Sequence, residues 1–230
     1  LWIGTENGIN YYLYKSKQLK TFTVTADGKK VKYVHSIHEL NDTTLWVSTV
    51  GEGIVKIILN KNGITPTVKS ATRIILDGGR LASNYFFTSF QENDSILWFG
   101  NRGYGAHRLN LETGKFTPYK FDNIVNSQMT NDIFAIYKNE NGYWFATSSG
   151  LLHFNQEDSQ HHNKVELLSK NTAHGILEDQ QNNIWISTNQ GLVRFNPKTH
   201  TSQTYDRKNG LEVTEFSDGA FYKDLSLIHI

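Results

Sequence analysis

Four carboxylates are the residues best suited to chemistry on a glycosidic bond: Glu39, Glu92, Glu178 and Asp179. Cleavage of that bond uses two carboxyl groups about 5 to 10 Å apart, one acting as an acid and the other as a nucleophile or base. Three of the four recur near the same place in a repeated phrase, where a turn should follow a short apolar segment. A catalytic pair is needed only once in a protein, whereas turn residues are needed in every copy of a repeat. We therefore predict turn-forming carboxylates and no catalytic residue.

The nine histidines raise the question of a metal site, because imidazole is a common metal ligand. His35 with His38 and the neighbours His161 and His162 are the most closely spaced. On a strand, residues one or three positions apart point to opposite faces, so neither pair forms a natural clamp for zinc. The sequence also lacks the signatures of serine hydrolases, zinc proteases and nucleotide-binding loops. We expect no metal and no cofactor, with these histidines in solvated loops.

A ligand-binding site is predicted at Arg102, Tyr104 and His107. They lie in the stretch 100–107, which departs from the repeat described below by carrying Asn in place of Thr and an additional Gly-Tyr. Together they offer a planar cation, an aromatic ring and a hydrogen-bonding imidazole. The alternative is a loop that packs on a neighbouring blade or on a second protomer. The aromatic stretch 85–87 could form a second exposed patch, although a core position is the preferred interpretation.

The five tryptophans define an internal repeat. They stand 41 to 52 residues apart, which is the range of a four-stranded blade, at Trp2, Trp46, Trp98, Trp144 and Trp185. Each lies in an apolar run followed by small residues and then by a Gly that could take a positive φ in a hairpin. An apolar run without polar alternation suits a strand buried on both faces. All five Trp are therefore expected in the core rather than stacked on sugar rings.

Up to three further strands are predicted around each Trp strand. Inner strands and polar turns precede it, at 36–40, 87–90, 134–137 and 175–177. A Gly-initiated strand follows it, and more polar outer strands are expected at 115–119 and 202–205, while 57–81 is interpreted as a long insertion. Four antiparallel strands in this order make a propeller blade. The predicted fold is all-β, a β-propeller of about five four-stranded blades.

Neither end of the sequence matches a complete blade. The first blade lacks its inner strand, and 215–224 is expected to be the inner strand of a further blade. A closed five-bladed ring and an arc of a larger, seven-bladed propeller both fit, and we prefer the arc. The last residues resemble a translated sequencing adapter, so the blades are assigned to 1–224 and a non-native tail to 225–230. We expect the chain to be part of a longer protein.

Composition excludes several classes of function. The 23 Lys and Arg residues nearly balance the 22 Asp and Glu residues, so no basic surface for nucleic acid or anionic lipid is expected. The absence of Cys excludes disulfides and thiolate chemistry. No apolar run approaches the roughly 20 residues that span a bilayer, so this segment is not expected to contact the membrane.

The last repeat resembles a known family. Its phrase runs from Glu178-Asp179 through Ile184-Trp185-Ile186-Ser187-Thr188 to Gly191-Leu192-Val193-Arg194-Phe195-Asn196-Pro197. It is similar to the two-component regulator propeller repeat, found in the periplasmic sensor region of hybrid two-component histidine kinases of Bacteroidetes. The linker-like stretches 81–84 and 209–216 resemble the family's connections between blades.

The resemblance implies a non-catalytic periplasmic sensor of oligosaccharides from polysaccharide breakdown, fused to an inner-membrane histidine kinase. Its implied partners are an oligosaccharide, the remaining blades and a downstream β-sandwich of the same chain, and a second protomer in a homodimer. Two other functions stay open. One is a propeller-fold polysaccharide lyase or glycoside hydrolase, and the other is a scaffold propeller that binds proteins. Fold alone does not choose among them.

Overall fold

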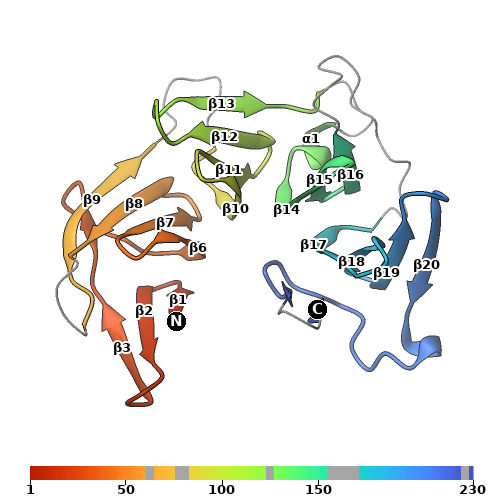
Figure 1. Ribbon diagram of the computed structural model, residues 1–230, viewed down its shortest axis with the longest axis horizontal. Helices are drawn as coiled ribbons and strands as arrows, with labels where there is room; N and C mark the ends of the chain where they lie inside the picture. The colour runs from red at the N-terminus through yellow and green to blue at the C-terminus, as the bar shows by residue number, and fades with distance from the viewer. Residues whose placement is uncertain (61–64, 76–82, 123–126, 155–170, 224–227, 230) are drawn as a thin grey trace. The chain divides into compact units, whose positions relative to one another are not determined.

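The computed structural model of the chain is built from short antiparallel strands. It describes residues 1–60, 65–75, 83–122, 127–154, 171–223 and 228–229. Within these residues the helical elements are α1 (Ser127–Thr130) and a 3-10 turn at Arg207–Asn209. The chain divides into two compact units, Leu1–Arg102 with Arg108–Phe116, and Gly103–His107 with Thr117–Ile230. Figure 1 follows the strands in chain order from red to blue.

The first part of the chain holds three of the predicted blades (Figure 1). The first sheet has the order β1-β2-β3, the second β6-β7-β8-β9 and the third β10-β11-β12-β13. A small ladder, β4 (Thr25–Ala26) with β5 (Lys29–Lys30), follows the first sheet. The strand bounds are β1 (Trp2–Thr5), β2 (Gly8–Leu13), β3 (Gln18–Phe22), β6 (Val34–Asn41), β7 (Thr44–Thr49), β8 (Ile54–Leu59), β9 (Val68–Ile74), β10 (Phe86–Asn93), β11 (Ile96–Asn101), β12 (Ala106–Asn110) and β13 (Phe116–Tyr119).

Two further sheets belong to the second unit. One has the order β14-β15-β16, and the other has the order β17-β18-β19-β20. A short ladder of β21 with β22 follows them. The bounds are β14 (Ile133–Asn139), β15 (Gly142–Thr147), β16 (Gly150–Phe154), β17 (Ala173–Glu178), β18 (Ile184–Thr188), β19 (Gly191–Asn196), β20 (Thr201–Tyr205), β21 (Tyr222–Lys223) and β22 (Ile228–His229). The predicted inner strands are therefore confirmed as β6, β10, β14 and β17.

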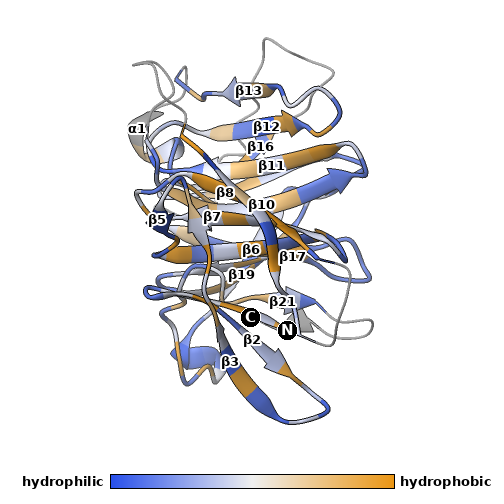
Figure 2. Cartoon of the chain, turned by 90° about the vertical axis from the view of Figure 1, so that its left-hand side faces the viewer, coloured by the Kyte–Doolittle hydropathy of each residue, from blue (hydrophilic) through white to orange (hydrophobic). Residues whose placement is uncertain are grey.

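Two of the Trp strands are buried on both faces along their whole length, as their lack of alternation predicts, whereas β1 is half-buried or exposed. Every residue of β7 and β11 is buried. Hydrophobic stretches along strands such as β8 and β11 are visible in Figure 2. Trp46, Trp98 and Trp144 are buried, whereas Trp2 and Trp185 are only half-buried. The core expectation thus matches the burial of three tryptophans, while two retain exposed surface.

The Thr and Gly of the repeated phrase close the hairpin after the Trp strand. The Thr188 hydroxyl donates to the carbonyl oxygen of Gly191 at 2.8 Å, and equivalent bonds close three other blades. Gly191 takes φ 119°, a backbone conformation that favours glycine. In the third blade Asn101 replaces the Thr, and its buried side-chain amide donates instead to the carbonyl oxygen of Ser83 at 2.6 Å. This substitution keeps the strand end bonded by a different route.

Two stretches differ from the sequence-based expectations. The region 57–81 was interpreted as an insertion, but it contains β9, which pairs with β8 as an outer strand. The expected inner strand at 215–224 is wrong for its described part, because Glu215–Phe221 contains turns and irregular backbone. In the predicted tail, residues 225–227 and 230 lie outside the described residues, and Tyr222 and Lys223 pair with His229 and Ile228.

Candidate functional site

Two of the carboxylates considered for catalysis instead hold tryptophan side chains. The indole Nε1 of Trp98 donates to Glu92 at 2.7 Å, and that of Trp185 donates to Asp179 at 2.8 Å. In the fourth blade Asn139 accepts the corresponding bond from Trp144 at 3.1 Å. The acceptor therefore stands five or six residues before the Trp in these blades. A structural role explains why polar residues recur at this position.

Asp179 also organises the turn between β17 and β18. Its carboxylate accepts from the backbone amides of Gln181 and Asn183, both at 2.9 Å, besides the Asn183 side chain. Desolvation raises the pKa of Asp179, but the hydrogen bonds from Asn183, Trp185 and the turn amides outweigh it and hold the pKa below its ordinary value. Asp179 is thus ionised and fully engaged in the fold. This is consistent with the predicted turn role.

Glu178 lies at the end of β17 and accepts hydrogen bonds from two side chains of the neighbouring inner strand, β14. It accepts from the Tyr137 hydroxyl at 2.6 Å and from the Asn139 side chain at 2.8 Å. Burial raises the pKa of the Tyr137 phenol, and the hydrogen bond and negative charge of Glu178 raise it further. The tyrosine is therefore a neutral donor at physiological pH. These contacts tie β14 to β17 within the second unit.

The histidine pair on β6 contacts the neighbouring inner strand, β10. His35 Nδ1 lies 2.7 Å from the carbonyl oxygen of Phe87, and His38 Nε2 lies 3.0 Å from the Gln91 side-chain oxygen. Both rings are half-buried rather than solvated in a loop. In the part of the chain that the structure describes, no three His, Asp or Glu side chains gather as a metal site would require. His161 and His162 lie outside the described residues.

The three residues predicted to bind a ligand have different surroundings. Arg102 is exposed, and its guanidinium lies 5.9 Å from the ring centre of Tyr85 in the first unit. In the second unit, Lys120 Nζ lies 4.6 Å from the ring centre of half-buried Tyr104. His107 is fully buried, so its imidazole does not reach solvent. A ligand role for Arg102, Tyr104 and His107 stays a prediction.

Burial of His107 predicts a loss of stability on acidification. Desolvation, with a smaller contribution from the Lys120 ammonium, lowers the pKa of His107 from 6.5 to about 4. Between these values the unfolded chain binds a proton that the folded chain does not. The free energy of unfolding should therefore fall as the pH drops from about 7 to 4, by up to about 3 kcal/mol, and this contribution should level off below pH 4.

Urea midpoints measured across this pH range test the effect. His107→Gln is expected to flatten the curve only in part, because burial also lowers the pKa of His38 and His153. The control is His200→Gln, at an exposed histidine. An unchanged slope in His107→Gln would contradict the assignment.

The aromatic stretch 85–87 divides between core and surface. Phe86 is fully buried in a cluster with Trp46, Leu97 and Phe99, while Tyr85 is 41% exposed. Phe87 is half-buried and its ring meets that of His35 edge-on, with centres 5.2 Å apart. The core interpretation therefore describes Phe86, and the exposed-patch alternative describes Tyr85.

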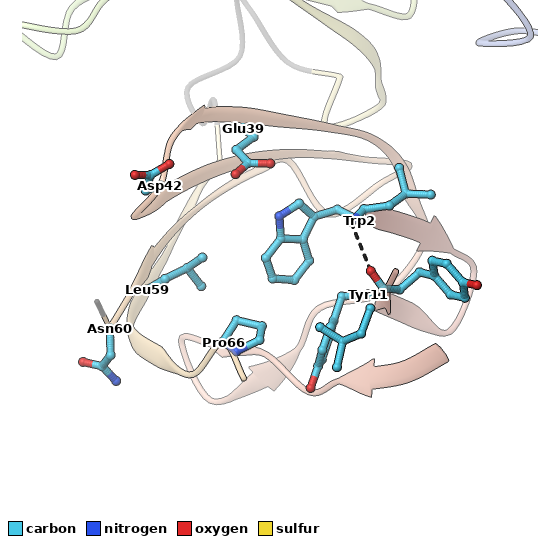
Figure 3. Close-up of a pocket in the computed structure, with 10 residues that line it drawn as sticks. Trp2, Tyr11, Glu39, Asp42, Leu59, Asn60 and Pro66 are labelled. Carbon is cyan, nitrogen blue, oxygen red and sulfur yellow. Dashed lines mark hydrogen bonds between the residues drawn. The ribbon is translucent and has the colours of Figure 1, made fainter. Parts of the chain in front are cut away.

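A cavity of about 450 Å³ opens between the first and second sheets of the first unit. Figure 3 shows the indole of Trp2 in its middle. The Trp2 ring is oriented by Phe22, whose ring centre lies 5.1 Å away in an edge-on arrangement, and by Tyr11 at 5.8 Å. The lining residues are Leu1, Trp2, Tyr11, Tyr12, Leu13, Glu39, Asp42, Leu59, Asn60 and Pro66.

Polar side chains on the hairpin and loop of the second sheet complete the cavity. Glu39 and Asp42 are exposed carboxylates, the first near the end of β6 and the second in the turn between β6 and β7. Asn41 shapes that turn, since its side-chain oxygen accepts from the backbone amide of Thr43 at 3.0 Å. Asn60 donates to the Thr67 hydroxyl at 2.8 Å. An aromatic floor with a few polar groups is the usual composition of a small-molecule site.

Sequence reasoning assigned Trp2 to the core and missed this cavity. The available signal was the adjacent pair Tyr11 and Tyr12, which stands where the last blade has Arg194 and Phe195. From sequence alone, Glu39 is considered only as one of four carboxylates that could serve catalysis or turns. Its pairing with Asp42 around Trp2 depends on how two sheets face each other, which no phrase within a single blade encodes.

The repeated Trp sheets define the chain as a β-propeller protein. Residues 167–190 match the family model of the two-component regulator propeller. The described residues contain no helix long and apolar enough to cross a membrane.

Known proteins resemble the chain in sequence and in fold. Histidine kinase P4 of Formosa agariphila is 28% identical over 160 residues, which cover 66% of this chain and 11% of that protein. The extracellular domain of a hybrid two-component system of B. thetaiotaomicron is 22% identical with a TM-score of 0.68, covering 95% of this chain and 29% of that one. A streptogramin B lyase gives 17% identity and a TM-score of 0.61, covering 87% and 62%. At these identities the two structural likenesses show the fold alone, and the chain spans about a tenth of the kinase.

Proposed function

We propose that this chain is part of the periplasmic ligand-sensing region of a hybrid two-component histidine kinase. It binds oligosaccharides released by polysaccharide breakdown and does not cleave them. The family match and the relatives support the sensor assignment. The structural roles of Glu92 and Asp179 support the absence of catalysis, since both carboxylates are committed to Trp indoles and turns.

The observation that carries the proposal is the cavity around Trp2. Its volume of about 450 Å³ lies within the range of small-ligand pockets, roughly 300–1,000 Å³. The faces of Trp2 and Tyr11 suit the apolar faces of sugar rings, and Glu39, Asp42 and Asn60 supply acceptors for sugar hydroxyls. Of the five repeat tryptophans, Trp2 is the one that lines this cavity.

Signal transfer in this proposal needs further parts of the protein. The ligand would favour one of two pre-existing arrangements of the sensor region, and that shift would change kinase output. The remaining blades, a downstream β-sandwich of the same chain and a second protomer in a homodimer are the proposed partners of this movement. The ligand-binding step can be measured on the chain itself.

Replacing Trp2 by alanine is expected to weaken oligosaccharide binding by roughly 10- to 100-fold, because about 1.5–3 kcal/mol of aromatic burial is removed. Isothermal titration calorimetry with neutral tri- to hexasaccharides of plant and host glycans measures the change. Trp185→Ala is the matched control, because Trp185 is the other half-buried repeat tryptophan and does not line the cavity. Equal losses in the two variants would refute a role for the cavity.

A cleavage assay and the same titrations together separate the alternative functions. If new reducing or unsaturated ends accumulate when the chain is incubated with a polysaccharide, the lyase or hydrolase alternative is correct. If no saccharide of the panel gives heat or raises the melting temperature, oligosaccharide sensing is wrong and the protein-binding scaffold becomes the leading function.

A further inference from the structure

The Trp2 cavity carries two negative charges at one side of its aromatic floor. Figure 3 shows Glu39 and Asp42 on the same side of the Trp2 indole, with Pro66 on the opposite side. Both carboxylates are exposed, and neither has a hydrogen-bond or ion-pair partner among the described residues. They are therefore available to a ligand rather than committed to the fold, unlike Glu92 and Asp179.

No positively charged side chain balances these carboxylates among the described residues that line the cavity. His38 precedes Glu39, but burial lowers the pKa of His38, so its ring is neutral at pH 7. Glu39 and Asp42 thus place two carboxylates beside the Trp2 indole in the described lining of the cavity.

Such an environment discriminates among saccharides by charge. A protonated amine is attracted both by carboxylates and by the face of an indole or phenol ring. A uronate or a sulfated sugar would place like charges close together, which disfavours binding. A neutral sugar would use the aromatic stacking and hydroxyl hydrogen bonds but would form no ion pair.

We infer that the cavity binds saccharides that carry a free, protonated amino group, with Trp2 against the sugar ring and Glu39 and Asp42 paired with the ammonium. This inference rests on the proposed function and names the chemical class of its ligand. It also predicts that acidic oligosaccharides are excluded.

Three trisaccharides that differ at one position of each ring test the inference. The β-1,4-linked trimer of glucosamine carries free amines, its N-acetylated form carries neutral amides, and cellotriose carries hydroxyls. Titration calorimetry in low salt, at a pH where the amines are protonated, is expected to give about tenfold tighter binding of the amine trimer than of the other two. Raising the salt concentration should reduce this preference, because exposed charge pairs are screened.

The double variant Glu39→Gln/Asp42→Asn should abolish the preference for the amine, so that the amine trimer binds no more tightly than cellotriose to the same variant. Glu6→Gln/Asp27→Asn is the matched control, because it removes the same charge from two exposed residues of the first unit that do not line the cavity.

Each outcome decides between the inference and the function beneath it. Equal affinity for the three trimers, or tighter binding of trigalacturonic acid, overturns the amine preference while leaving oligosaccharide sensing intact. Binding of lysine amide as tightly as the amine trimer would also overturn it, because the site would then recognise an amine without a sugar ring. If none of the saccharides binds, the proposed function itself is wrong.

Discussion

Trp98→Ala should lower the free energy of unfolding by about 3–5 kcal/mol, the usual loss when a large buried aromatic side chain is removed. Trp98 is fully buried on β11, and its indole nitrogen donates to Glu92 at 2.7 Å. The Glu92 side chain is only 7% exposed and also lies 3.7 Å from the Nε of Arg108. Truncation thus removes core packing and takes a donor from a buried carboxylate, which adds to the loss.

Urea unfolding followed by far-ultraviolet circular dichroism measures this effect without depending on the removed fluorophore. Trp185→Ala is the matched comparison, because Trp185 occupies the same repeat position and donates to Asp179, but it is half-buried. We expect its loss to be clearly smaller. A loss for Trp98→Ala below 1 kcal/mol would show that the Trp strands are not the main source of stability in their blades.

The fold could be predicted from sequence because each blade repeats its physical constraints. The apolar run around Trp46 has no polar alternation, and every residue of β7 is buried accordingly. The turn at Asn41 and the hairpin at Gly53 also follow from residue types that favour such backbone. Prediction failed where a strand lacks the phrase, as in β9, whose residues Val68–Ile74 alternate only weakly and were interpreted as an insertion.

The candidate site was harder to predict for a different reason. Departures from the repeat indicated Arg102, Tyr104 and His107, but a departure can equally serve packing, as the complete burial of His107 illustrates. The cavity is formed by Trp2 from one sheet and by Glu39 and Asp42 from the next. None of the three residues stands out from the repeat position that it occupies. Only the arrangement of the two sheets shows that they line the same cavity.

The recurring carboxylates illustrate how one pattern supports two interpretations. Recurrence after each inner strand favoured turns over catalysis, and Asp179 accepts two turn amides in agreement with that view. Sequence alone did not reveal the second role, in which Glu92, Asn139 and Asp179 accept from the Trp indole of the same blade. The acceptor is Glu, Asn or Asp in different blades, so residue type alone does not show that each blade places an oxygen at the Trp indole. The hydrogen bonds in the structure show it.

The hairpin glycine of the last blade should be the second most sensitive position. Gly191 has φ 119°, and a Cβ placed there would collide with the backbone carbonyl oxygen of Tyr205 on β20. Neither atom can move without disturbing the ladder in which Leu192 pairs with Tyr205. Gly191→Ala is therefore expected to lower the free energy of unfolding by about 2–4 kcal/mol, from backbone strain and the steric clash together.

Gly210→Ala separates the two causes. Gly210 also has a positive φ, 90°, but a Cβ built on it would meet nothing within 4 Å. Its substitution should therefore cost only the conformational strain, about 1 kcal/mol. Urea midpoints of the two variants, measured under identical conditions, should differ by at least that amount. Equal losses would mean that strain alone limits both positions, and that the close approach of β19 to the Tyr205 carbonyl is not what requires glycine in the repeated phrase.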